Sequence, residues 1–334
     1  MIWLKFVLCL AIIFFAGTRL ARYGDAIAEK AGIGRIWIGL LLLAAITSMP
    51  ELVTGVSSAA LVASPDLSLG TLLGSCSLNL AIIALLDILH PHTPVLTKAS
   101  PGHKIPASWG ILLVAIAAGA ILTGETFSRL SLGWVGIPSI VILAVYLVGI
   151  WLMFRYERSH QLVTQAAAEK YNEISTRIVY LRFALAAAAV IAAGIWLSFI
   201  GDGIAETTGW DATFVGSLFL AITTSMPELV VSVAALRLGA EDMAIADILG
   251  SNMFNIAIIA PVDLFYTQGA ILCSASSSHL ITAAAVAIMS LLIIIGLRFR
   301  QKRKTFIVVS WYALALIVIY AFGAYALFSS NVAL

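Results

Sequence analysis

The chain has 334 residues, of which 61% are hydrophobic and only 11% are charged, a balance that excludes an ordinary soluble domain. Its 19 basic and 17 acidic residues leave a net charge of +2, too small an overall field to attract nucleic acid. Cys9, Cys76 and Cys273 lie far apart and form no metal-binding or redox motif. We therefore expect an integral membrane protein surrounded by a lipid bilayer.

Apolar windows of about 20 residues, the length that crosses a bilayer, recur along the whole chain. In chain order, ten predicted spans cover residues 2–20, 35–62, 68–89, 106–123, 134–154, 178–199, 212–236, 243–265, 278–297 and 305–328. If these spans alternate in direction, 17 of the 19 basic residues fall on one side of the membrane, and only Lys5 and Arg129 on the other. The positive-inside rule then places both termini on the non-cytoplasmic side.

An internal repeat divides the chain into two halves. The segment GDAIAEKAGIGRIWIGLLLLAAITSMPELV, starting at Gly24, aligns without a gap with GDGIAETTGWDATFVGSLFLAITTSMPELV, starting at Gly201. Five predicted spans separate equivalent positions, and because five is odd, the second copy crosses the membrane in the opposite direction. We expect an all-α polytopic fold with two inverted five-helix repeats, residues 1–154 and 178–334, joined by a cytoplasmic linker at 155–177.

A proline and a glutamate interrupt the same predicted span of each half, as Pro50-Glu51 and Pro227-Glu228. Proline removes a backbone hydrogen bond, and an exposed carbonyl at membrane depth requires protein or a water-lined cavity around it. A charged carboxylate near the bilayer centre costs about 2.5 to 3.5 kcal/mol or more. Two such glutamates at equivalent positions of a repeat therefore indicate a functional site.

Neutral oxygen ligands accompany both glutamates. At helical spacing, two hydroxyl residues lie three and four positions before each glutamate, and a serine and an asparagine lie four apart in the next span of each half. These residues are Thr47, Ser48, Ser75 and Asn79 in the first half and Thr224, Ser225, Ser251 and Asn255 in the second. An all-oxygen set suits Ca²⁺ or Na⁺ and lacks the thiolate or imidazole of a transition-metal site.

The motifs TSMPELV and GSNMFN resemble the paired signature repeats of the sodium/calcium exchanger family of cation/calcium antiporters. The resemblance covers essentially the whole chain and implies a prokaryotic-type ten-helix member. It implies that Glu51 and Glu228 are the central ligands, with the hydroxyl and amide residues named above around them. It also implies backbone carbonyl ligands at Ala44 and Ala221, with no cofactor and with Ca²⁺ and Na⁺ as the transported ions.

The chain departs from the family pattern at several positions. Ile46 and Thr223 stand where the family commonly has glycine, and Cys76 stands where the motif has asparagine. One of the positions equivalent to Asn79 and Asn255 is Asp in many sodium/calcium members. The two glutamates thus remain as the only obvious central charges, and the use of sodium stays open.

The sequence favours a secondary active antiporter that exchanges Ca²⁺ for Na⁺ by alternating access, with exchange of H⁺ for Ca²⁺ or another divalent cation as the alternative. A cation channel and an intramembrane enzyme are the other classes considered. We expect no enzyme, because no span contains an H-E-x-x-H or G-x-S-x-G motif. His90, His92, His103, His160 and His279 fall in predicted loops or at helix ends, where water would satisfy them.

Three aspartates in or near the predicted spans rank below the glutamates. Asp87 and Asp263 are repeat equivalents, and we expect them at interfacial helix ends, while Asp247 receives no role. Inorganic cations and the lipid bilayer are the expected partners of a functional monomer, without nucleic acid. We expect it in a bacterial or archaeal inner or plasma membrane.

Overall fold

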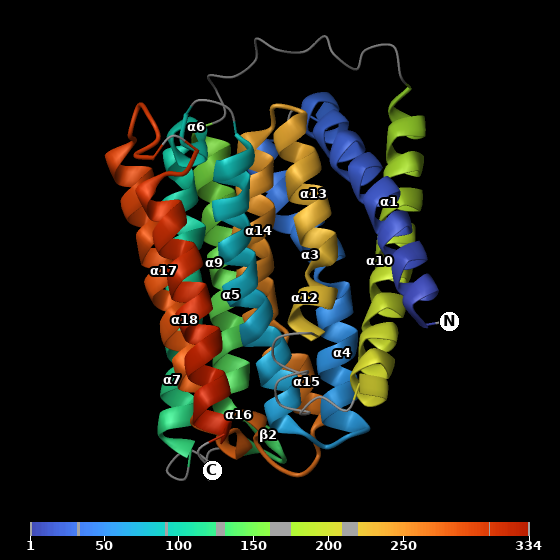
Figure 1. Cartoon of the computed structure of the whole chain (residues 1–334), viewed down its shortest axis with the longest axis vertical. Coiled ribbons are helices and arrows are strands. Elements are labelled where there is room, and N and C mark those ends of the chain that lie inside the picture. The colour runs from blue at the N-terminus through green and yellow to red at the C-terminus, as the bar shows by residue number, and fades with distance from the viewer. Residues whose placement is uncertain are drawn as a thin grey trace.

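A bundle of long helices makes up the molecule, as the computed structural model in Figure 1 shows. The structure describes residues 2–31, 34–90, 93–124, 131–160, 175–208, 220–306 and 308–332. The first half contains α1 (Ile2–Ala31), α2 (Arg35–Trp37), η1 (Ile38–Leu43), α3 (Ala44–Thr47), α4 (Met49–Ala60), α5 (Pro65–Leu89), α6 (Val95–Lys98), η2 (Pro101–His103), α7 (Lys104–Leu122), β1 (Ser131–Leu132), β2 (Val135–Gly136) and α9 (Ile137–His160). The second half contains α10 (Thr176–Thr208), α12 (Ala221–Thr224), α13 (Met226–Arg237), α14 (Glu241–Ala257), α15 (Ile259–Phe265), α16 (Ile271–Ser274), α17 (His279–Phe299) and α18 (Trp311–Val332).

The ten expected spans all have helical counterparts. Within the described residues, seven helices are long and apolar enough to cross a membrane, and Arg35–Thr47 with Met49–Ala60 forms a further span bent by 41°. The pair α12 and α13 repeats this broken span, although its expected start at residue 212 lies outside the described residues. The tenth span is α18, with a shorter apolar stretch at Trp311–Leu327.

Several predicted boundaries are wrong. Helix α1 continues to Ala31 instead of residue 20, α10 continues to Thr208 instead of 199, and α18 starts at Trp311 instead of 305. A hydropathy window detects only the apolar part of a helix, whereas the last turns of α1 carry Asp25, Glu29 and Lys30. Strands β1 and β2 form a small antiparallel hairpin that the all-α expectation lacked. Residues 161–174 of the expected linker lie outside the described residues.

The two broken spans run in opposite directions through the middle of the bundle. In Figure 1, α4 lies below α3, whereas α13 lies above α12. Helix α14 packs against η1, α3, α5 and α13, and the span that it begins has 94% of its apolar window buried, compared with 22% for α9. Helices α1 and α10 pack against each other at one edge of the bundle (Figure 1). The inverted repeats therefore bring the broken spans, α5 and α14 together at the centre.

Asp87 and Asp263 fasten equivalent short helices to the ends of the long ones. The Asp87 carboxylate accepts a hydrogen bond of 2.9 Å from the N–H of Val95, the first residue of α6. The Asp263 carboxylate accepts one of 2.7 Å from the N–H of Ile271, the first residue of α16. Both aspartates lie near helix ends, as expected, and both are fully buried within the protein. The burial of these two carboxylates is tolerated because backbone N–H groups donate hydrogen bonds to their oxygens.

Two histidine–aspartate pairs connect the repeats, one pair near each end of the bundle. His103 Nε2 lies 2.8 Å from Asp242 Oδ1, and His279 Nε2 lies 3.0 Å from Asp66 Oδ1. In both pairs, the same carboxylate oxygen accepts the backbone N–H three residues before the histidine, at 2.6 and 2.7 Å. The expectation that water satisfies these histidines is wrong, because both are buried. Below, these contacts are called the His–Asp pairs.

Candidate cation-binding site

The breaks in the two central spans fall at equivalent serines. Ser48 has φ −88° and ψ 10°, and Ser225 has φ −84° and ψ 8°, so both leave α-helical geometry. Pro50 and Pro227 then lie in the first turns of α4 and α13, where the missing proline N–H leaves no hydrogen bond unmade. Each following glutamate thereby sits at a helix N-terminus, whose partial positive charge favours a carboxylate.

The repeats exchange hydrogen bonds between their serines and glutamates. Ser48 donates its hydroxyl to Glu228 Oε1 at 2.9 Å, and Ser225 donates to Glu51 Oε1 at 3.2 Å. All four side chains are fully buried. Helical spacing predicted that each serine shares a face with the glutamate of its own span. The serine instead reaches the opposite repeat because it lies in the break, where helical spacing does not apply.

Two pairs of hydroxyls cross between the repeats in the same symmetric manner. Thr47 Oγ1 lies 3.4 Å from Ser251 Oγ, and Ser75 Oγ lies 3.3 Å from Thr224 Oγ1. Each pair joins a broken span to the next long helix of the other repeat, α14 or α5. The structure thus brings the predicted hydroxyl ligands of both halves into buried contacts around the glutamates.

Several oxygens of the site keep free lone pairs. Within the described part of the chain, Glu51 Oε2, Glu228 Oε2 and the side-chain amides of Asn79 and Asn255 have no hydrogen-bond partner. All four residues are fully buried, and a buried polar atom without a partner costs about 1 to 3 kcal/mol. The two carboxylates also repel each other electrostatically. A hard cation would relieve both the repulsion and the unsatisfied oxygens, since it binds carboxylate, hydroxyl and amide oxygens.

The backbone carbonyls of Ala44 and Ala221 are engaged in helical hydrogen bonds. The Ala44 carbonyl accepts from the Ser48 N–H at 3.1 Å, and the Ala221 carbonyl accepts from the Ser225 N–H at 3.0 Å. A carbonyl oxygen has a second lone pair, but the hydroxyls of Thr47 and Thr224 also approach these oxygens at 3.3 Å. The role of the two carbonyls as ligands stays a prediction.

Two glycines let α1 and α10 approach the broken spans closely. A Cβ atom at Gly194 of α10 would lie 2.4 Å from Cγ of Pro50 and 3.4 Å from Cγ of Pro227. A Cβ atom at the equivalent Gly17 of α1 would lie 2.9 Å from Cγ1 of Val230 in α13. Real side chains do not pack at such distances, so only glycine permits these contacts.

Asp247, which received no role from the sequence, is a third buried carboxylate near the site. Asp247 of α14 is fully buried and accepts a hydrogen bond of 2.9 Å from Ser232 in α13. It lies four and eight residues before Ser251 and Asn255, so the three residues share one face of α14. This helical spacing from two predicted ligands was the feature of the sequence that could have placed Asp247 near the site. Asp247 therefore adds a third buried carboxylate near the two glutamates.

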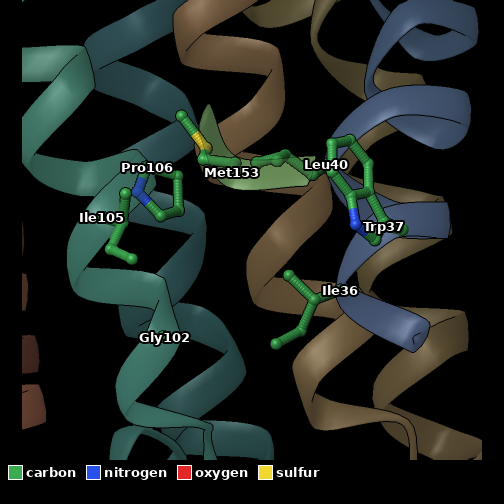
Figure 2. Close-up of a pocket in the computed structure, with 7 residues that line it drawn as sticks. All are labelled: Ile36, Trp37, Leu40, Gly102, Ile105, Pro106 and Met153. Atoms are coloured by element: carbon green, nitrogen blue, oxygen red, sulfur yellow. The ribbon is translucent and has the colours of Figure 1, made fainter. Parts of the chain in front are cut away.

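A small pocket away from the glutamates has a different character. Figure 2 shows its lining of Ile36, Trp37, Leu40, Gly102, Ile105, Pro106 and Met153, contributed by α2, η1, η2, α7 and α9. No charged side chain lines this pocket, so it offers no ion chemistry. In the described residues, no cluster of three or more His, Cys, Asp or Glu side chains forms a metal site either. The paired glutamates with their neutral oxygens are therefore the candidate cation site.

Comparisons with known proteins agree with this arrangement. The chain is 27% identical over 274 residues to the inner membrane protein YrbG of Escherichia coli (strain K12), covering 78% of this chain and 79% of YrbG. It is 26% identical to the putative antiporter CaxA of Alkalimonas amylolytica, covering 88% and 89% of the two chains. A solved structure of the sodium-calcium exchanger NCX_Mj has the same fold, with a TM-score of 0.72, 20% identity and coverage of 96% and 98%.

The family model described as sodium/calcium exchanger protein matches residues 1–155 and 178–329, which include both repeats and all the residues of the site. The match covers most of the chain, and the unmatched residues 156–177 separate its two blocks. The chain belongs to the sodium/calcium exchanger protein family.

Proposed function

We propose that this protein is a secondary active antiporter that exchanges Ca²⁺ for Na⁺ by alternating access. The observation that carries the proposal is the reciprocal pair of hydrogen bonds, Ser48 to Glu228 and Ser225 to Glu51. These contacts orient one oxygen of each carboxylate and leave the other available to an ion between the repeats.

Charge and ligand number both support Ca²⁺ as one substrate. Two ionised glutamates carry a formal charge of −2, which one Ca²⁺ neutralises. Calcium takes about six to eight oxygen ligands, more than two carboxylates supply. The proposed ligand set is Glu51, Glu228, Thr47, Ser48, Thr224, Ser225, Ser75, Ser251, Asn79 and Asn255, with the carbonyls of Ala44 and Ala221.

The neutral oxygens that would serve Ca²⁺ could also serve Na⁺ as the counter-ion. A proton would bind only to the carboxylates, whereas Na⁺ also needs hydroxyl, amide and carbonyl oxygens. The amides of Asn79 and Asn255 are buried within the described structure without hydrogen-bond partners. Such groups have no use for a proton but are suitable ligands for a hard cation. Exchange of H⁺ for Ca²⁺ is the alternative that the experiment below distinguishes.

Family membership excludes the intramembrane hydrolase considered above, because the family consists of exchangers and not of enzymes. For this chain we further propose a bacterial or archaeal plasma membrane, both termini on the non-cytoplasmic side, and a functional monomer. The division into repeats at 1–154 and 178–334, with a cytoplasmic linker at 155–177, belongs to the same proposal. An exchanger of this kind needs no cofactor, since the ions themselves supply the energy.

Calcium uptake into proteoliposomes tests the coupling ion. Vesicles loaded with Na⁺ are compared with matched vesicles that carry only an outward proton gradient, using wild type, Glu51→Gln and Glu228→Gln. We expect uptake driven by Na⁺ and abolished in both variants. Uptake driven only by the proton gradient would replace Na⁺ with H⁺ as the counter-ion. A continuous conductance without coupled flux would contradict antiport altogether.

A further inference from the structure

Asp247 is a buried carboxylate that the proposed central site does not use. Its Oδ2 accepts the Ser232 hydroxyl at 2.9 Å, while its Oδ1 has no hydrogen-bond partner among the described residues. The side chain is fully buried. A carboxylate in such surroundings is costly unless a cation or a proton neutralises it.

The other repeat has no carboxylate at the equivalent position. The counterparts of Asp247 and Ser232 are Thr71 and Gly55, by offsets of 176 and 177 residues. The Thr71 hydroxyl donates to the carbonyl of Leu67 in its own helix at 2.9 Å. The repeats are therefore symmetric in their glutamates but asymmetric in this third charge.

The third carboxylate lies between one end of the bundle and the central site. Helix α14 begins at Glu241, so Asp247 precedes Ser251 by one turn, or about 6 Å along the axis. The preceding helix α13 ends at Arg237, in the loop that the positive-inside rule places in the cytoplasm. Asp247 thus lies on the cytoplasmic side of the glutamates.

Polar contacts connect Asp247 with the central site. Thr47 Oγ1 lies 3.4 Å from Ser251 Oγ, which follows Asp247 by one turn on the same face of α14. The Asp247 and Glu228 carboxylates repel each other electrostatically. The charge at Asp247 therefore changes the electrostatic potential at Glu228 in the central site.

We propose that Asp247, with the hydroxyls of Ser232 and Thr47, forms an accessory Na⁺ site on the cytoplasmic side of the glutamates. The site favours a monovalent ion, because one carboxylate balances one positive charge and Ca²⁺ prefers more oxygen ligands and more charge. With Ca²⁺ at the two glutamates and Na⁺ at Asp247, these three carboxylates all have counter-charges. This inference rests on the proposed exchange of Ca²⁺ for Na⁺.

The test compares sodium-driven uptake with exchange that needs no sodium. Asp247→Asn keeps the size of the side chain and removes its charge. We expect the Na⁺ concentration for half-maximal uptake to rise by about tenfold, the change that corresponds to 1.4 kcal/mol of lost binding. The Hill coefficient for Na⁺ should fall, while the half-saturating Ca²⁺ concentration of Ca²⁺/Ca²⁺ exchange without Na⁺ should change much less than the half-maximal Na⁺ concentration. Asp247→Glu, which retains the charge, should preserve part of the sodium affinity.

Thr71→Val is the matched control, since it alters the repeat-equivalent position without removing a carboxylate, and both activities should stay at wild-type levels. An unchanged sodium dependence in Asp247→Asn would overturn the accessory site. A parallel loss of sodium-driven uptake and Ca²⁺/Ca²⁺ exchange would assign Asp247 a structural role instead, and a change confined to the pH profile would assign it a proton. Absence of sodium-driven uptake in the wild type would contradict the proposed function itself, which separates the two failures.

Discussion

Ser48 and Ser225 tie the two repeats together at the level of single residues. Each hydroxyl donates to the glutamate of the other half, at 2.9 and 3.2 Å. A hydrogen bond to a charged group contributes about 1.5 to 3 kcal/mol. The serines therefore orient the carboxylates and help to determine the spacing between the broken spans.

Replacing either serine by alanine should weaken calcium binding. In Ser48→Ala or Ser225→Ala, the opposite carboxylate loses its donor and its fixed orientation. We expect the half-saturating Ca²⁺ concentration to rise by about tenfold or more, as the loss of 1.5 to 3 kcal/mol implies. Ca²⁺/Ca²⁺ exchange measures this directly. Ser57→Ala, six residues beyond Glu51 in the same helix, should behave as the wild type, and equal calcium affinity in all three variants would contradict the role of the crossed bonds.

The residues of the site could be predicted from the sequence because the repeat places the same oxygen-bearing types beside both glutamates. Their pairing could not, since Ser48 and Glu228 are 180 residues apart and meet only through the inverted fold. The hydrogen bond between His103 and Asp242 could not be predicted for the same reason, because the two residues lie 139 positions apart. Asp247 received no role from the sequence because the repeat offers only Thr71 as its equivalent.

At the scale of elements, the broken spans and the helices beside them carry the proposed movement. Helices α1 and α10 approach these spans at Gly17 and Gly194, which are equivalent by the offset of 177 residues. Gly194 lies against the prolines that interrupt the spans, and Gly17 lies against Val230 of α13. Rocking of α1 and α10 across this contact would alternately open the two sides of the site.

A side chain at Gly194 should obstruct that movement. The Cβ atom of Gly194→Ala would lie 2.4 Å from Cγ of Pro50, so α10 must shift away from the broken span. We expect the maximal rate of exchange to fall severalfold, with a smaller change in calcium affinity. Rates of Ca²⁺/Ca²⁺ exchange under saturating calcium provide the measurement. Gly119→Ala is the control, because a Cβ atom there meets nothing within 4 Å; equal rates in the two variants would contradict the proposal.

The sequence predicts the spans well because each must be apolar over the thickness of a bilayer. It does not predict the π-helical turn of η1, Ile38–Leu43, since its residues are ordinary apolar ones. Packing explains this turn better than composition does, because η1 lies against α14 and Gly39 approaches the backbone of Met243. Tertiary contacts thus determine the local geometry that hydropathy leaves undefined.

At the scale of the whole molecule, the inverted repeat appears in structural contacts as well as in the site. The two His–Asp pairs obey the same offset of 176 residues, as do the contacts of Asp87 with Val95 and of Asp263 with Ile271. Each His–Asp pair joins one repeat to the other. The halves are therefore fastened to each other near both ends, outside the ion site.

Removing a His–Asp pair should lower stability without abolishing ion binding. In Asp242→Asn, His103 loses a charged partner and the backbone N–H of Ser100 loses a strong acceptor. We expect a decrease of about 1 to 3 kcal/mol in stability, within the range for hydrogen bonds to charged groups. The thermal unfolding midpoint of the purified protein would fall, with the half-saturating Ca²⁺ concentration close to that of the wild type. Asp66→Asn should have a comparable effect, and unaltered midpoints in both variants would contradict a fastening role.

Calcium binding at the two glutamates is the claim on which the account depends most. Equilibrium binding of radioactive calcium to the purified protein, without Na⁺ or any gradient, measures it directly in the wild type, Glu51→Gln and Glu228→Gln. The account predicts one bound Ca²⁺ per wild-type chain and, in each variant alone, an affinity at least about a hundredfold weaker, corresponding to about 2.7 kcal/mol or more. Wild-type calcium affinity in either variant would contradict a single site shared between the repeats.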